Sequence, residues 1–265
     1  MLTNIQKYLE LVVFYIRLNV SAQLAYRSAF FSQLVAMLLN NIIWIIFWGV
    51  FFTRFPVLQD WKLNDVITLW AIVTAGFGLT SAVYGNALRL APLIVQGQLE
   101  VWMLYPCPLL PHILLGRASA TAWGDMIFGY CAYLLLIKPD FVHFVLFLGL
   151  SFSVAFLFAG FGILTGSLSF YIGNATSLAE QWQFAMSSFS TYPSVLFEGR
   201  VKLLLYTLIP AIFINHFPIQ ALRDFSLFDA FLAMAGALGI FTVSMIVFYC
   251  GIKRYETGNL MEMRD

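Results

Sequence analysis

Residues Leu203–Ile214 read LLLYTLIPAIFI, an apolar run that is too short to cross a membrane. A spanning helix needs about 20 apolar residues to cover about 30 Å of hydrocarbon. Arg200 and Lys202 precede the run, and Pro210 removes a backbone donor within it. Because proline breaks a helix, two short helices suit this segment better than one rod. We therefore predict a re-entrant helical hairpin over residues 198–222.

The composition of the whole chain is that of a polytopic membrane protein. Hydrophobic residues make up 61% and charged residues 10%, against about 25% charged residues in soluble domains. A net charge of +1 gives no signal for a nucleic-acid partner. The 3 cysteines form neither a disulfide framework nor a metal-ligand spacing. We predict an all-α membrane protein with one domain, residues 1–265, embedded in the lipid bilayer.

An amphipathic helix and six crossings are predicted along the chain. Residues 1–26 carry Lys7, Glu10 and Arg17, which would be costly inside a span, so we expect a helix lying in the membrane interface. Five apolar stretches and a more polar fifth crossing follow. The six predicted crossings cover residues 28–52, 66–84, 113–137, 141–171, 175–197 and 228–250.

The basic residues of the loops set the orientation of these crossings. With the N-terminus inside, eight Lys and Arg residues lie on the inner side and six on the outer side. We predict a multi-pass protein of the cell (inner) membrane with both termini in the cytoplasm. Residues 85–111 then form a long cytoplasmic coupling loop, and residues 198–222 lie on the outer side.

Three stretches carry a resemblance to a known family. The first, Val95–Pro106 (VQGQLEVWMLYP), holds a Gly-x-Leu-acidic pattern followed by aromatic residues and proline. The last, Gly251–Glu256 (GIKRYE), is a basic, aromatic flank after the final crossing. Between them lie Tyr192-Pro193, Ile209-Pro210 and Asn215-His216-Phe217-Pro218. In these motifs and their order the chain resembles the permease subunits of bacterial type-2 ABC exporters, in the six-span branch with a separate ATPase.

The resemblance implies partners and roles. It implies two permease subunits, from the same or a related chain, and cytoplasmic ABC ATPase subunits that bind ATP and Mg, while this chain holds no cofactor and no metal. A coupling helix in the inner loop would transmit ATPase closure, and the outer element would lie near the exit. The coupling residues are Arg89, Gly97, Leu99, Glu100 and Trp102, and the outer residues are Tyr192, Pro193, Pro210, Asn215 and Pro218.

Several of these residues have a simpler interpretation as well. Glu100 either docks on a basic ATPase surface or is a solvated loop carboxylate. Gly97 permits a helix break or is a turn residue, and Arg89 and Arg117 act in the loop or anchor it at the interface. Ser177, Glu180, Gln181, Ser188 and Thr191 give the fifth crossing its polarity, so they line a transport path or hydrogen-bond to other helices.

Asp125 lies in the middle of the third crossing, where an isolated charge is costly. It either pairs with another group of the chain or contacts cargo, and we favour pairing. An alternative function, a membrane-embedded lipid-processing enzyme, would use Asp125, His143 and Glu180 as acid-base groups, although they lie at different predicted depths. A secondary transporter is a third hypothesis, but no inverted repeat supports it.

No nucleotide-binding, zinc-protease or serine-hydrolase motif occurs in the sequence, so we predict no catalytic residue in this chain. Our preferred hypothesis is the transmembrane subunit of an ATP-driven exporter for a hydrophobic or amphipathic substrate. The sequence leaves open which substrate is carried and whether the permeases form a homodimer or a heterodimer.

Overall fold

The computed structural model describes residues 2–255, which are helical almost throughout and contain no β-strand. This confirms the prediction of an all-α polytopic membrane protein. Five elements of the described chain are long and apolar enough to cross a membrane. They are α2 (Arg27–Arg54), α3 (Leu63–Val83), α7 (Ala120–Ala132) with the π-helical turn η2 (Tyr133–Ile137), α8 (Phe141–Ser167) with α9 (Ser169–Ile172), and α14 (Leu227–Ile252).

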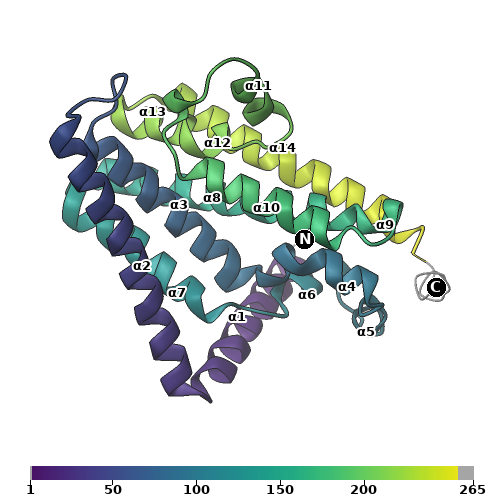
Figure 1. Ribbon diagram of the computed structural model, residues 1–265. Helices are drawn as coiled ribbons and strands as arrows, with labels where there is room; N and C mark the ends of the chain where they lie inside the picture. The colour runs from purple at the N-terminus through teal and green to yellow at the C-terminus, as the bar shows by residue number, and fades with distance from the viewer. Residues whose placement is uncertain (1, 256–265) are drawn as a thin grey trace.

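Shorter helices join or precede these spans. Helix α1 (Leu2–Leu24) comes first and forms a V with α2 along one edge of the bundle (Figure 1). The others are η1 (Gly85–Arg89), α4 (Leu90–Val95), α5 (Leu99–Met103), α6 (Leu109–Leu115), α10 (Thr176–Ser190), η3 (Ser194–Leu196), α11 (Gly199–Thr207), α12 (Ile212–Asn215) and α13 (Phe217–Arg223).

Helix α3 forms the centre of the bundle. Its spanning window is 83% buried within the chain, whereas that of α2 is 11% buried. Small residues allow the close approach that membrane helices need. A Cβ added at Gly129 of α7, for example, would lie 2.5 Å from the carbonyl oxygen of Ala71 in α3. The backbones of neighbouring helices therefore approach one another closely around α3, whereas most of the surface of α2 contacts no other part of the described chain.

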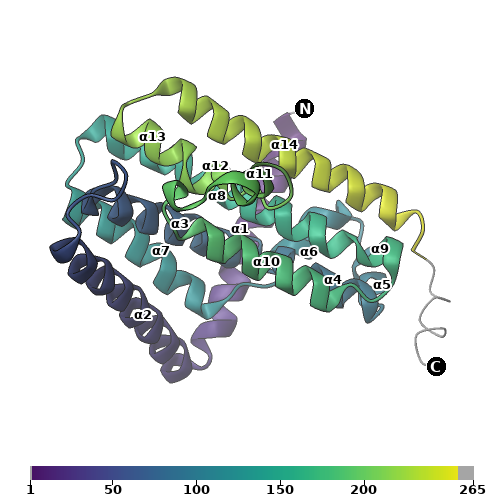
Figure 2. The ribbon, with the colours of Figure 1, turned by 45° about the horizontal axis from the view of Figure 1, so that its top comes forward.

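Two broken segments lie at opposite ends of the bundle (Figures 1 and 2). Residues 84–119, the α4–α6 segment, lie at the end that also holds α9 and the C-terminal part of α14. Residues 191–226, the α11–α13 segment, lie toward the other end, where α3 begins and α7 turns into α8.

Two predicted crossings have other boundaries in the structure. The third, predicted over residues 113–137, is interrupted after α6, because the extended backbone at Ser119 donates a hydrogen bond to the carbonyl of Ser81 (2.9 Å). Its spanning part begins at Ala120. The fifth, predicted over residues 175–197, is the 15-residue helix α10. At about 1.5 Å per residue it is roughly 22 Å long, short of the ~30 Å hydrocarbon layer.

The α11–α13 segment breaks at the predicted proline. Helix α11 and the α12–α13 pair meet at an angle of 93°, and Pro210 lies in the break between them. Leu205, Ile212 and Ile214 are buried against the bundle. This geometry is that of a broken span or a re-entrant loop. That the segment returns to the same side of the membrane remains a prediction.

Candidate functional site

The turn from α4 to α5 is fixed by Gly97. This glycine has φ +70°, the left-handed region that L residues with side chains rarely adopt. Its N–H donates to the carbonyl of Ile94 (3.1 Å), and the N–H of Gln98 donates to that of Leu93 (3.0 Å). These two bonds form a Schellman motif, the usual helix end with a left-handed glycine. Gly97 therefore ends α4 and sets the direction of α5.

Leu99 and Trp102 hold α5 against the bundle. Leu99 is 0% exposed and belongs to an apolar cluster with Leu90, Ile113 and Phe248. The Trp102 ring packs edge-on against His112, with 4.9 Å between ring centroids. It also covers Gly116, where an added Cβ would lie 2.2 Å from its Cη2 atom.

The opposite side of α5 and the turn after it present an apolar surface. Val101 is 58% exposed and Leu104 is 83% exposed, and Met103 and Tyr105 are exposed beside them. Glu100 is exposed as well. Burial and, to a smaller extent, the negative charge of the Glu100 carboxylate raise the pKa of the Tyr255 hydroxyl. The predicted coupling residues thus divide into buried anchors (Leu99, Trp102), a turn residue (Gly97) and an exposed acidic group (Glu100).

Helix α1 is joined to α6 and to the loop after it by three polar side chains on one face. The Tyr15 hydroxyl bonds to Nδ1 of His112 (2.9 Å), Asn19 donates to the carbonyl of Leu115 (3.0 Å), and Gln23 donates to that of Ala118 (3.1 Å). The sequence analysis missed these residues, because it considered only the charged side chains of residues 1–26. Their spacing of four was the available signal, since it places them in one row along a helix.

His112 lies in an aromatic cage. The rings of Tyr15, Trp102 and Tyr105 have centroids 4.9–5.5 Å from its imidazole. Burial lowers the pKa of His112 from its usual value of 6.5. A neutral imidazole therefore connects α1, α5 and α6.

Arg89 and Arg117 line a cavity of about 450 Å³ beside the α4–α6 segment. Asn19, Gln23 and Asn86 contribute amide groups to it. Both arginines are exposed, and neither forms an ion pair with any residue in the described part of the chain. No carboxylate lines the cavity. This end of the bundle is therefore basic where it meets α1.

Comparison with known families assigns the chain. The family model for ABC-2 family transporter proteins matches residues 37–258. The chain belongs to this family. The match confirms the resemblance to type-2 ABC permeases and makes the chain a multi-pass transmembrane subunit of an ABC transporter. No match was found among curated proteins or among solved structures.

In this ABC-2 subunit the polar residues of α10 lie on two different faces of the helix. Gln183 points inward and donates to Thr165 Oγ1 (3.2 Å). Ser177, Glu180 and Gln181 are exposed, together with Phe184 (74% exposed), and Ser188 and Thr191 continue the stripe in a half-buried position. The stripe therefore faces away from the chain's own bundle.

Asp125 is 2% exposed and accepts a hydrogen bond from Nδ2 of Asn41 (2.8 Å). Oδ1 of Asn41 accepts one from Nε1 of Trp70 (3.1 Å). The partner of Asp125 is thus an amide from α2, which the sequence analysis missed, and this polar chain links α7, α2 and α3.

The three candidate acid-base groups of the enzyme hypothesis line no common cavity. His143 lines a pocket between α3, α8 and α13, and Glu180 lines a different one with Phe77 and Phe184. Asp125 lines neither. Within the described residues, no group of three or more His, Cys, Asp or Glu is arranged to hold a metal ion. The three groups that the enzyme hypothesis names therefore do not share one pocket.

The predicted outer residues connect the α11–α13 segment to the end of α10. Asn215 is 0% exposed, and its Nδ2 donates to the carbonyls of Phe189 (2.9 Å) and Tyr192 (3.3 Å). Pro193 prevents α10 from continuing past this point, and Pro218 occupies the first turn of α13, where a missing N–H costs little. The short motifs therefore mark turns and a helix-end contact.

Proposed function

We propose that this chain is the permease of an ATP-driven exporter, and that the α4–α6 segment is the docking site of a separate ATPase that binds ATP and Mg. The observation that carries the proposal is the exposed apolar surface of α5 (Val101, Leu104 and Tyr105) on a buried anchor. Such a surface at the end of a bundle, and not along its lipid-facing sides, is typical of a contact with another protein. Glu100 beside it would fix the register on a basic ATPase surface.

The packing of the segment supports transmission of movement. Below α5, the 3₁₀ turn η1 lies against α8, where a Cβ at Gly162 would be 2.8 Å from the carbonyl oxygen of Ala87. On the other side, Tyr15 and Asn19 connect α1 to α6, and Gln23 connects it to the loop after α6. Displacement of α5 by a closing ATPase would therefore be passed on to α8 in the bundle and to α1 at its edge.

A second permease subunit fits the surface of α10. Exposed polar side chains such as Ser177 and Gln181 are unfavourable against lipid, so this face requires protein or water. Pairing of two permeases across such a face would leave a polar-lined path for a hydrophobic or amphipathic substrate. In this assembly the α4–α6 segment and both termini lie in the cytoplasm, and the subunit lies in the inner membrane.

The docking proposal is tested with one substitution at two places. Val101 and Val57 are exposed to similar extents (58% and 54%), but Val57 lies in the loop before α3, at the other end of the bundle. The transporter complex is purified from native membranes through the full-length permease, and the copurifying vanadate-sensitive ATPase activity is measured. Val101→Asp should reduce this activity at least about tenfold, since an apolar contact becomes a buried charge, and Val57→Asp should retain it. Equal retention by both variants, or wild-type complex without an ATPase, would refute docking through α5.

A further inference from the structure

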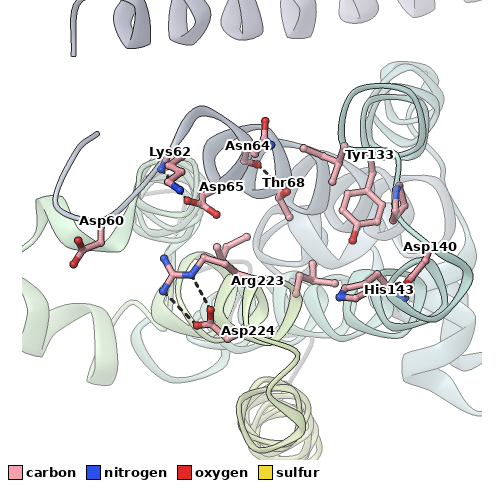
Figure 3. Close-up of a pocket in the computed structure, with 14 residues that line it drawn as sticks. Asp60, Lys62, Asn64, Asp65, Thr68, Tyr133, Asp140, His143, Arg223 and Asp224 are labelled. Atoms are coloured by element: carbon pink, nitrogen blue, oxygen red, sulfur yellow. Dashed lines mark hydrogen bonds and ion pairs between the residues drawn. The ribbon is translucent and has the colours of Figure 1, made fainter. Parts of the chain in front are cut away.

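A polar pocket of about 760 Å³ lies near the end of the bundle opposite α5 (Figure 3). It is formed by the loop before α3, the first turn of α3, the turn from η2 to α8, and the end of α13. Its volume lies within the range of roughly 300–1,000 Å³ that small-molecule sites occupy. Figure 3 shows Lys62, Asp65, Thr68, Tyr133, His143 and Arg223 around the shared space, with Asp60 at its margin.

Three of its four carboxylates are already used by neighbouring groups. Asp65 accepts the backbone N–H of Lys62 (2.8 Å), which begins α3. Asp140 accepts from the backbone and Nδ1 of His143 (2.8 and 2.6 Å), at the start of α8. Asp224 pairs with Arg223 at 3.3 Å. These contacts hold the wall of the pocket in place.

Some of the other polar groups of the pocket form no hydrogen bond or ion pair through their side chains with the described residues. Tyr133 is 2% exposed, and its hydroxyl makes no hydrogen bond with any described residue. Its ring stacks on Phe147 with 3.9 Å between centroids, so the hydroxyl is held in position. The Lys62 ammonium and the Asp60 carboxylate form no ion pair within residues 2–255. The pocket therefore offers a hydroxyl without a hydrogen bond, and an ammonium and a carboxylate without an ion pair, among the described residues.

The surroundings of the pocket place it at the boundary of the hydrocarbon layer. Leu135 (68% exposed), Phe141 (80%) and Phe225 (44%) project from the same turns that form its wall. Lys138 lies between Leu135 and Phe141 and is also exposed. Exposed aliphatic and aromatic residues next to a lysine are typical of the level of the lipid head groups. A ligand of this pocket would thus reach it from the polar layer of the membrane.

We infer that the pocket binds a zwitterionic ammonium-phosphate group, the chemistry of an ethanolamine phospholipid head group. An anion alone would face an excess of carboxylates, and a cation alone would leave Lys62 without a counter-charge. In a zwitterion, the ammonium meets Asp60 and Asp65. The phosphate meets Lys62 and the Nη1 group of Arg223, which makes no hydrogen bond to the described chain, and the glycerol oxygen atoms next to it reach the Tyr133 hydroxyl across the pocket.

Such a ligand would connect parts of the chain that are far apart in sequence. Asp65 belongs to α3, Tyr133 to η2 and Arg223 to α13. An occupied pocket would therefore tie the α11–α13 segment to the central bundle. This inference does not depend on the ATPase docking proposal.

Binding of glycerophosphoethanolamine to the full-length protein in detergent, measured by titration calorimetry, tests the inference. Wild-type protein should bind it at least tenfold more tightly than inorganic phosphate or ethanolamine alone. Loss of one neutral hydrogen bond in Tyr133→Phe should weaken binding about fivefold, and loss of the charge in Lys62→Gln about tenfold or more. Two matched controls should bind as the wild type does. Tyr130→Phe removes a hydroxyl that bonds to Ser151 outside the pocket, and Lys138→Gln removes the lysine of the same turn.

Nanodiscs distinguish the source of the group. If a lipid supplies it, the soluble probe should bind in discs of phosphatidylglycerol and be displaced in discs that contain phosphatidylethanolamine. Equal binding in both discs would support the same chemistry from a soluble ligand. The inference is overturned if the probe does not bind, if inorganic phosphate binds equally well, or if Tyr130→Phe and Tyr133→Phe weaken binding equally. Thermal unfolding of each variant without ligand verifies that it is folded.

Discussion

The two broken segments of this ABC-2 subunit are built from similar short helices but differ in which of their apolar residues the chain buries. Both consist of short helices separated by glycine or proline turns. In the α11–α13 segment the apolar residues Ile212, Ile214 and Ile219 of the α12–α13 pair are buried, whereas α11 and the turn after it expose Val201, Leu203 and Leu208. In the α4–α6 segment Leu99 is buried, but Val101 and Leu104 are exposed. The α12–α13 pair is therefore covered by its own chain, whereas α5, like α11, presents apolar surface that its own chain does not cover.

The difference extends to the polar groups. Asn215 and Ser194 of the α11–α13 segment bond to the end of α10 and to His216. Arg89 and Arg117 of the α4–α6 segment form no ion pair with any described residue. Within the α12–α13 pair the polar side chains bond inside the chain, apart from the buried Oδ1 of Asn215, which has no partner among the described residues. Helix α11 keeps Arg200 and Lys202 exposed and without an ion pair in the described chain, as the α4–α6 segment keeps its arginines, and accessible charge of this kind is typical of a segment that meets a partner. The α12–α13 pair and the α4–α6 segment should therefore respond differently to substitution.

The largest effect is expected from Asn215→Leu. The substitution leaves the carbonyls of Phe189 and Tyr192 without their donor in a part-buried site, and it also removes the buried Oδ1 of Asn215, which has no partner among the described residues. At about 1–3 kcal/mol per unsatisfied group, the free energy of unfolding should fall by roughly 2–4 kcal/mol. Asn19→Leu removes one bond at a half-buried position of α1 and should cost about 0.6 kcal/mol, the average for membrane hydrogen bonds. Reversible unfolding in lipid nanodiscs measures both.

The comparison between the two variants carries the test. If Asn19→Leu cost as much as Asn215→Leu, the two segments would be equally dependent on internal hydrogen bonds. The distinction between the covered α12–α13 pair and the accessible α4–α6 segment would then be wrong.

A smaller effect is expected from Gly116→Ala. The new methyl group would lie 2.2 Å from the Trp102 ring, so the ring must leave its position against His112. Overpacking of this kind costs about 1–3 kcal/mol. Because α5 moves with its anchor, copurifying ATPase activity should fall several-fold as well.

Gly149→Ala provides the control for this prediction. A Cβ at Gly149 of α8 would meet no atom within 4 Å, and alanine is the better helix former by about 1 kcal/mol. Stability should therefore be unchanged or higher, and ATPase association unchanged. A Gly116→Ala variant with wild-type Trp102 fluorescence and wild-type ATPase association would show that this ring does not position α5.

The sequence was sufficient for the elements whose signal is local. Long apolar runs predicted α2, α3, α8 and α14, and Pro210 predicted the break in the short segment, because length and proline act within the segment itself. The end of α10 was missed by several residues. Its helix stops where Pro193 and the contact from Asn215 redirect the chain, and that contact depends on a residue far along the sequence.

Less of the candidate site could be predicted from the sequence. The Gly-x-Leu-acidic pattern pointed to Gly97, Leu99 and Glu100, but it could not separate the buried anchor from the exposed surface. The Tyr15–His112 and Asn41–Asp125 contacts join residues 97 and 84 positions apart. Contacts over such separations depend on how helices pack, which the periodicity of a single helix does not contain. They were found only with the tertiary structure.

The smallest effect is a pH dependence centred on His112. Burial lowers the pKa of this imidazole in the folded protein, so the unfolded chain takes up a proton more readily. Its contribution to stability is full above the unfolded pKa of about 6.5 and is lost as the pH falls from there toward the folded pKa. Protonation at low pH would also oppose the close packing of Tyr15, Trp102 and Tyr105 around the ring.

We expect the wild-type unfolding temperature to fall as the pH is lowered from about 8 to about 5. In His112→Gln, which keeps a polar partner for Tyr15 but does not titrate, this fall should be smaller. Identical pH profiles for the two proteins would mean that the cage holds α1, α5 and α6 together without sensing the charge of the imidazole, and the steeper loss of stability would then have to come from another group.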